Sequence, residues 1–211
     1  WETTKTFDFG VDINFFNNKL QVIADYYNKK TIDMLLALEI PSYIGLSNPD
    51  NNTGTMKTNG WELAINYNNN IGDLNYTISA NLSDFKSTMG YLGGTEFLGD
   101  QVKLEGSEFN EWYGYQSDGI YQTAEEVTNS ATINNRVKPG DIKYKDISGP
   151  EGVPDGKISP EYDKVLLGGS LPRYEYGGSI QLDYKNFDFN LIFQGIGKQN
   201  SYLSINMVEP F

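Results

Sequence analysis

Apolar and polar residues alternate with a period of two along several stretches of this chain. In the clearest one, residues 6–15, polar or small residues alternate with Phe7, Phe9, Val11, Ile13 and Phe15. A period of two is the side-chain repeat of a β-strand, so the pattern predicts a two-faced strand of about ten residues. Residues 16–19 then predict a tight turn, after which the apolar positions resume at Leu20, Val22, Ala24 and Tyr26.

Two further hairpins follow the same design. Residues 62–67 and 74–82 alternate on either side of a predicted turn at residues 68–73, and residues 174–184 and 187–193 alternate on either side of a turn at residues 185–186. A stretch rich in Pro and Asn, residues 41–58, predicts an irregular connection before the second hairpin. Short turns at one end and long connections at the other are typical of outer-membrane β-barrels.

The same alternation also occurs in a soluble β-sandwich. Two features favour a membrane barrel. The segments approach the roughly 9 to 11 residues that a tilted membrane strand needs, and tyrosines gather at strand ends as an interfacial belt would place them: Tyr26, Tyr27, Tyr67, Tyr174, Tyr176 and Tyr184. We therefore predict an all-β chain of antiparallel transmembrane β-barrel strands with long extracellular loops, forming part of a barrel. The alternative is a soluble β-sandwich that binds a glycan or a protein.

Composition narrows the possible functions. The chain has no Cys and no His, which excludes thiolate metal sites and His-dependent nucleophilic catalysis from this stretch. Its net charge of -12 argues against a nucleic-acid partner. The acidic residues near Glu105, Glu111, Glu125 and Glu126 could supply a glycosidase pair, but they are better explained as solvated loop charges, so we predict no enzyme. The first residues show neither an initiator Met nor a signal sequence, and we expect a part of a longer polypeptide.

Several sequence blocks resemble, in order, those of the SusC/RagA-like TonB-dependent transporters. The blocks are residues 1–12 (WETTKTFDFGVD), 25–31 (DYYNKKT), 59–63 (NGWEL), 112–115 (WYGY), 118–123 (DGIYQT), 138–146 (KPGDIKYKD), 171–174 (LPRY), 187–189 (FDF) and 193–195 (FQG). The resemblance covers nearly the whole chain. It implies that residues 1–211 are part of one C-terminal receptor β-barrel domain, with a long loop region at residues 87–170, and that the plug domain and the terminal strands are absent.

What the resemblance implies about function goes further than the strand pattern. Members of the family lie in the outer membrane of Bacteroidetes-like Gram-negative bacteria, in contact with its lipid. They import nutrients together with a SusD-like surface lipoprotein, and the TonB complex supplies the energy. The TonB contact belongs to the N-terminal part, which this sequence lacks. The cargo implied is an oligosaccharide, with peptides as the alternative.

One loop resembles a calcium-binding loop of the family, of the form D-x-N-G-D-G-x-I. Oxygen ligands at alternate positions suit a hard cation such as Ca²⁺. The candidate ligands here are Asp146, Ser148, Asp155 and Asp163, together with Lys157 through its backbone carbonyl. The pattern departs from the family's form because residues 150–154 interrupt it and Ser148 replaces the usual Asn. The alternative is an Asp- and Gly-rich surface turn without metal. Calcium is thus the one cofactor that the sequence suggests.

Three aromatic residues of the long loop region are candidates for contact with cargo or with the surface lipoprotein. Trp112, Tyr113 and Tyr115 lie within four positions of one another. Exposed aromatic rings provide broad surfaces for stacking on sugars or on a protein partner. Packing within the loop is the alternative explanation, and the sequence leaves both open.

Overall fold

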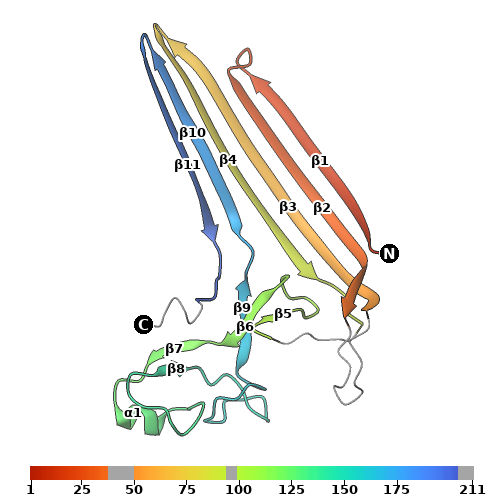
Figure 1. Cartoon of the computed structure of the whole chain (residues 1–211), viewed down its shortest axis with the longest axis vertical. Helices are drawn as coiled ribbons and strands as arrows, with labels where there is room; N and C mark the ends of the chain where they lie inside the picture. Colours follow the sequence, from red (N-terminus) through yellow and green to blue (C-terminus); the bar gives the residue numbers. More distant parts are fainter. Residues whose placement is uncertain (38–49, 94–98, 204–211) are drawn as a thin grey trace. The chain divides into compact units, whose positions relative to one another are not determined.

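The computed structural model describes residues 1–37, 50–93 and 99–203. It divides into two compact units (Figure 1). The strand unit comprises residues 1–97, 103–110 and 169–211, and the loop unit comprises residues 98–102 and 111–168.

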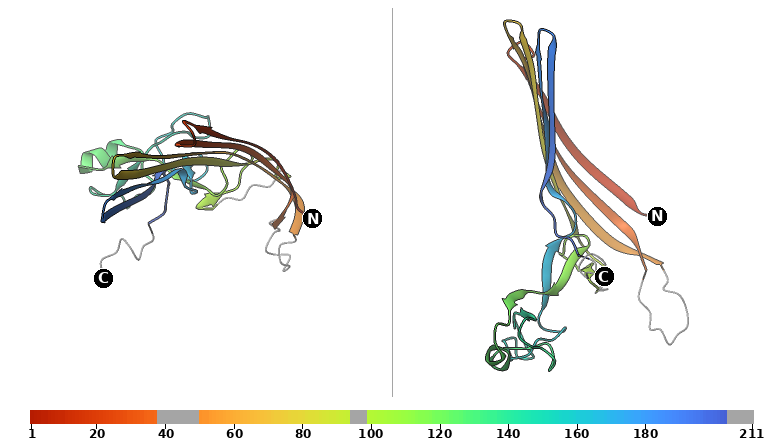
Figure 2. Two further views of the ribbon diagram at one scale, coloured as in Figure 1. Left: turned by 90° about the horizontal axis from the view of Figure 1, so that it is seen from above. Right: turned by 60° about the vertical axis from the view of Figure 1, so that its left-hand side comes forward.

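The strand unit is built on a six-stranded antiparallel sheet with the order β1-β2-β3-β4-β10-β11. Its strands are β1 (Thr3–Phe15), β2 (Leu20–Ala37), β3 (Asp50–Ile71), β4 (Leu74–Met89), β10 (Arg173–Tyr184) and β11 (Phe187–Lys198). Every neighbouring pair in this sheet is antiparallel, including β4 and β10, which lie far apart in the sequence. Figure 2 shows the sheet twisted and open, with β1 and β11 as its edges.

The strand register gathers the apolar residues on one face. Val11, Ala24, Leu63, Leu82 and Tyr176 form one continuous row across five strands. Paired residues in an antiparallel sheet point to the same side, so the alternation within each strand adds up to an apolar face and a polar face. Among the large apolar side chains exposed on this face are those of β1 and β11, with Phe7 64% and Phe189 53% exposed.

Two of the three predicted turns are confirmed, and one was placed too early. The chain turns at residues 16–19 and at residues 185–186 as expected. Residues 68–71, predicted as part of a turn, instead extend β3, which pairs with β4 until Ile71 opposite Leu74. The turn is only Gly72-Asp73, with Gly72 at a φ of +58° that glycine adopts without strain.

The predicted connection at residues 41–58 was also wrong in part. Residues 50–58 belong to β3, and residues 41–49 lie outside the described residues. Because β3 therefore runs over 22 residues and β2 over 18, the strands exceed the predicted length of about ten. The extra length lies at the ends of the strands that are far from the short turns.

A small apolar core closes the loop end of the sheet. Leu36, Met89 and Leu92 are buried there, with Met34, Met56 and Phe109 packed against them. Residues 103–110 reach this core by pairing with the end of β4. The N–H of Phe109 donates to the carbonyl of Ser87 at 2.9 Å, and the N–H of Met89 donates to the carbonyl of Ser107 at 2.8 Å.

The loop unit contains short elements. Strands β5 (Gln101–Val102), β6 (Glu111–Tyr115) and β9 (Lys164–Gly169) form one sheet, and β7 (Ser117–Ile120) and β8 (Ile142–Tyr144) form another. Helix α1 (Ala124–Asn129) is one and a half turns long. The buried Tyr121 ties these parts together, since its hydroxyl donates to the carbonyl of Ala131 at 2.6 Å. Within the described residues no helix is long and apolar enough to cross a membrane.

The predicted loop region, residues 87–170, contains the whole loop unit. It also contains residues 103–110, which belong to the strand unit.

Candidate functional site: the polar face and the loop unit

A groove runs along the polar face of the strand unit. Side chains from β2, β3, β4, β10 and β11 line it. Among them are Ser79 and Asn81, two of the alternating polar residues expected on this face. The groove lies on the side of the sheet opposite the apolar rows, which is the side that faces the lumen in a barrel.

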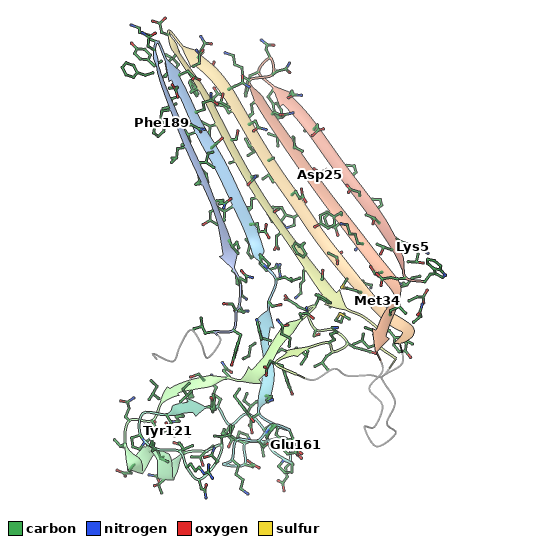
Figure 3. The ribbon with its side chains drawn as sticks, viewed as in Figure 1. Lys5, Asp25, Met34, Tyr121, Glu161 and Phe189 are labelled. Carbon is green, nitrogen blue, oxygen red and sulfur yellow. The ribbon has the colours of Figure 1, made fainter. Side chains whose placement is uncertain are left out.

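Carboxylates form a row in this groove. Asp25 of β2 lies opposite Glu62 of β3, Glu62 lies opposite Ser83 of β4, and Ser83 lies opposite Glu175 of β10. Neighbouring strands are about 4.8 Å apart, so the three carboxylates span about 15 Å across the sheet. Asp25, labelled in Figure 3, also lies over Gly10 of β1, where a β-carbon would come within 2.2 Å of its Oδ1. The groove is therefore acidic.

One tyrosine of the expected interfacial belt lies on this polar face instead. The ring of Tyr27 covers Gly60, where a β-carbon would lie 2.2 Å from the ring. Lys29 follows it, with Nζ 4.6 Å from the centre of the Tyr27 ring. Assigning Tyr27 to the lipid interface was therefore wrong, because two consecutive residues of a strand point to opposite faces and Tyr26 already occupies the apolar one.

An ion-pair cluster fixes residues 103–110 to the sheet. Arg173 makes two hydrogen bonds to the carboxylate of Asp84, at 2.5 and 2.6 Å. Glu108 lies 3.9 Å from the Arg173 guanidinium and 2.9 Å from Nζ of Lys86. A two-point contact between Arg and a carboxylate holds both partners in a defined geometry. The sequence offered no local signal for this cluster, because Asp84 and Arg173 come from distant strands.

The three candidate aromatic residues lie on β6, in the sheet of the loop unit. Because successive residues alternate across a strand, Tyr113 and Tyr115 share one face and Trp112 lies on the other. Lys164 joins the two tyrosines, with Nζ 5.7 Å from the centre of each ring, and Tyr115 also packs against Tyr144 at 5.2 Å between ring centres. All three candidates are half-buried. Part of their surface is used in packing, and their contact with cargo or lipoprotein stays a prediction.

Asp163 lies at the centre of the loop that resembles a calcium-binding loop. Its side chain is 0% exposed. It accepts backbone N–H groups from Ile147 at 2.8 Å, Ser148 at 3.3 Å and Ser159 at 2.7 Å. Burial by itself raises the pKa of this carboxyl, but the N–H donors outweigh burial and lower the pKa below its usual value. Asp163 thus joins two segments of the loop as an ionised carboxylate.

Asp146 and Asp155 also accept hydrogen bonds from the backbone. The carboxylate of Asp146 accepts the N–H of Gly156 at 2.6 Å and that of Asp155 at 3.3 Å, and Asp155 accepts the N–H of Lys157 at 3.0 Å. Within the described residues, no three Asp or Glu side chains converge as a metal site requires. These contacts are those of an Asp-rich turn. The proposed ligand set, which also includes Ser148, stays a prediction.

Glu126 of α1 has a structural role. Thr123 caps the helix by accepting the N–H of Glu126 at 3.1 Å, and the Glu126 carboxylate accepts the N–H of Gln122 at 2.9 Å. This backbone hydrogen bond, followed by the hydrogen bond from Lys143, lowers the pKa of Glu126, and the same contact with Glu126 raises the pKa of Lys143. Glu126 is therefore committed to the helix cap.

The family to which these features belong follows from comparison with known proteins. Residues 1–204 match the family model described as "TonB dependent receptor-like, beta-barrel". The chain belongs to this family. The antiparallel sheet with one apolar and one polar face is accordingly part of a receptor β-barrel, and the chain is not an enzyme.

Named relatives agree with the assignment. The TonB-dependent receptor P3 of Formosa agariphila is 33% identical over 92% of this chain and 20% of its own length. The TonB-dependent receptor SusC of Bacteroides thetaiotaomicron is 24% identical over 90% of this chain and 19% of its own length. This segment of a receptor barrel therefore spans about a fifth of the relatives it matches.

A solved structure has the same fold. The structure of the RagAB peptide transporter superposes with a TM-score of 0.72 at 21% identity, covering 92% of this chain and 21% of that one. At this identity the likeness concerns the fold alone. It confirms the expected barrel strands. Together with the family match and the SusC relative, it also bears out the expected resemblance to the SusC/RagA type.

Proposed function

We propose that the polypeptide containing this segment is a TonB-dependent importer of nutrients in the outer membrane of a Gram-negative bacterium of the Bacteroidetes type. In this proposal the strand unit forms part of the barrel wall, and the loop unit is one of its long surface loops. A SusD-like surface lipoprotein and the TonB complex are the proposed partners, the latter through parts of the protein outside this segment.

The observation that carries the proposal is the separation of the two faces of the sheet. Continuous rows of apolar residues cover one face, and the other holds Asp25, Glu62 and Glu175 in register. In lipid, β-strands are stable only as part of a closed barrel whose outer face is apolar. A soluble sandwich, the alternative, would cover the apolar face with a second sheet, and the described residues contain no second sheet of comparable size.

The proposed cargo is an oligosaccharide, with peptides as the alternative. An acidic wall suits neutral sugars, because it does not repel them and offers carboxylate acceptors to their hydroxyl groups. It also suits cationic peptides and disfavours anionic ones. The peptide alternative is supported by two solved structures with this fold, those of the RagAB peptide transporter and of the RagAB peptide importer in its closed-closed state.

Uptake by a deletion strain tests the function. The strain is complemented with the full-length protein and supplied in parallel with an oligosaccharide pool and a peptide pool, each as the sole source of its nutrient. We expect growth on the oligosaccharides to depend on the intact protein. If growth depends on the protein only when peptides are supplied, the proposed oligosaccharide cargo is wrong. If growth is independent of the protein on every pool, the proposed import function is wrong.

Location is tested separately by fractionation. We expect the full-length protein in the outer membrane, extractable only with detergent, and migrating on gels at two positions depending on heating. A protein that is soluble in plain buffer would favour the β-sandwich. Co-purification of a surface lipoprotein, identified by mass spectrometry, tests the proposed partner.

A further inference from the structure

Three lysines lie side by side on the apolar face of the strand unit. Lys5 of β1 is paired with Lys30 of β2, and Lys30 is paired with Lys57 of β3. Residues opposite each other in neighbouring strands point to the same side, and Lys5 lies two positions from Phe7, so this lysine row shares the face of the exposed aromatic residues. All three side chains are exposed. Figure 3 shows Lys5 at the end of β1 far from the short turn.

Among the described residues, the lysine row has no counter-charge. None of the three lysines makes an ion pair with another described residue, whereas Lys86, one strand further, is paired with Glu108. Like charges directly opposite each other in a sheet destabilise it. In a chain with net charge -12, three adjacent unpaired amines are therefore an arrangement that calls for an anion from outside.

Charges are also sorted between the faces. The carboxylates of Asp25, Glu62 and Glu175 lie on the polar face. On the apolar face the described strands carry the lysine row and Lys86. The carboxylates next to them, Asp84 and Glu108, are paired with Arg173 and Lys86. The lysines therefore face away from the lumen, toward whatever surrounds the barrel.

The residues between the turn and the lysine row change in the order of a membrane interface. After the row Phe15, Leu20 and Tyr67 next to the turn come two aliphatic rows. The aromatic row Phe9, Tyr26 and Trp61 follows, in register across the same three strands. The next row is Phe7, Asn28 and Asn59, in which a side-chain hydrogen bond joins the two asparagines, and the lysine row follows it. Aromatic residues mark the edge of the hydrocarbon, and basic residues lie beyond it at the level of the headgroups.

The depth agrees. Lys5 and Lys30 lie about ten residues from Phe15 and Leu20 at the turn, or about 33 Å along the strand. A strand tilt of about 40° reduces this to about 25 Å along the membrane normal, which is the height of the apolar band of an outer-membrane barrel. The row therefore lies at the headgroup level of the leaflet next to the long loops, which is the outer one.

We propose that Lys5, Lys30 and Lys57 bind the phosphate groups of an anionic lipid in the outer leaflet. The acyl chains of this lipid would lie against the aliphatic rows, and its sugar or glycerol part against Phe9, Tyr26 and Trp61. This inference rests on the location of the barrel in the outer membrane, as proposed above, but not on the cargo.

Lipid retention by the purified full-length protein tests the inference. The protein is placed in phosphatidylcholine nanodiscs containing either phosphorylated lipid A or the same lipid with its phosphates removed, and bound lipid is measured by native mass spectrometry. Each lysine near an anionic surface contributes about fivefold to binding, so replacing all three with Gln is expected to lower retention of the phosphorylated lipid about a hundredfold. Replacing all three with Arg keeps the charge and is expected to retain it.

A charge-matched control replaces Lys29, on the polar face, together with Lys138 and Lys145 of the loop unit, by Gln, and retention is expected to be unchanged. Equal retention of the dephosphorylated lipid, or retention by the triple Gln variant, would overturn the inference. Displacement of the lipid by millimolar inorganic phosphate would do the same, because a general anion site would then explain the binding.

Heat-dependent migration on gels is recorded for every variant. If the triple variant does not fold, the single change Lys30→Gln takes its place, with an expected loss of about fivefold. A folded outer-membrane barrel that imports cargo but shows no lysine-dependent lipid retention would refute this inference and leave the proposed function intact.

Discussion

Placing an arginine on the apolar face is expected to destabilise the barrel, whereas placing one on the next residue of the same strand is not. Ile65 is 38% exposed, pairs with Val22 and Ala80, and lies about midway along β3 between the turn and the lysine row. Arg at the midplane of the lipid face of such a barrel costs about 2 to 4 kcal/mol. Asn66 points to the polar face, where an Arg remains in contact with water and carboxylates.

The measurement is the free energy of unfolding of the full-length protein in lipid vesicles. It is obtained from a urea titration in which heat-dependent gel migration reports the folded fraction. We expect Ile65→Arg to lower it by about 2 to 4 kcal/mol and Asn66→Arg to change it by less than about 1 kcal/mol. Equal losses for the two variants would refute the assignment of the faces. A third variant, Ala80→Leu, separates lipid from a protein core: it is expected to be neutral or stabilising against lipid, but would cost about 1 to 3 kcal/mol in a packed sandwich.

Three further predictions concern local structure. Gly178→Ala is expected to destabilise the strand unit by about 1 to 3 kcal/mol in the same titration, because a β-carbon there would lie 2.4 Å from the carbonyl oxygen of Ser79; an unchanged stability would contradict this packing. Asp163→Asn is expected to lower hydrogen-exchange protection of residues 147–159 in the full-length protein by about 2 kcal/mol. Since the pKa of Asp163 is lowered in the folded state, its contribution to stability is complete above the unfolded pKa of about 3.9 and is lost as the pH falls through the folded pKa. Hydrogen-exchange protection of the wild type should therefore fall in that pH range, whereas the Asn variant should show no such step. Calcium is expected to leave this protection unchanged, because Asp146 and Asp155 already accept backbone N–H groups, and a calcium-dependent increase that Asp155→Asn abolishes would instead establish the cation site.

The alternation of side chains was sufficient to predict the hairpins, because a half-buried strand shows its two faces directly in the sequence. It was not sufficient to find where β3 ends. Residues 68–70 are three consecutive asparagines, a residue type common in turns, yet they pair with residues 75–77 of β4 because Gly72-Asp73 already provides a two-residue turn. Composition alone does not distinguish a polar strand end from a loop.

The pairing of β4 with β10 depends on contacts between distant parts of the chain. More than eighty residues separate the two strands, and neither strand carries a local signal for its partner. The same holds for Asp84 and Arg173, whose two hydrogen bonds become visible only once these strands are adjacent. The side on which Tyr27 lies could have been read from the sequence, however, because strict alternation from Tyr26 places it on the polar face.

The unpaired edges of the sheet, together with its apolar face, determine the kind of structure in which it can be stable. In the described residues β1 and β11 each pair on one side only, and their outward-facing aromatic residues, such as Phe9 and Phe189, are exposed. An unpaired backbone N–H or carbonyl in lipid costs several kcal/mol, so a strand edge of this length is incompatible with a membrane unless further strands cover it. The apolar face requires lipid and the edges require more strands. Together these two requirements call for a closed barrel, in which the acidic polar face becomes part of the inner wall.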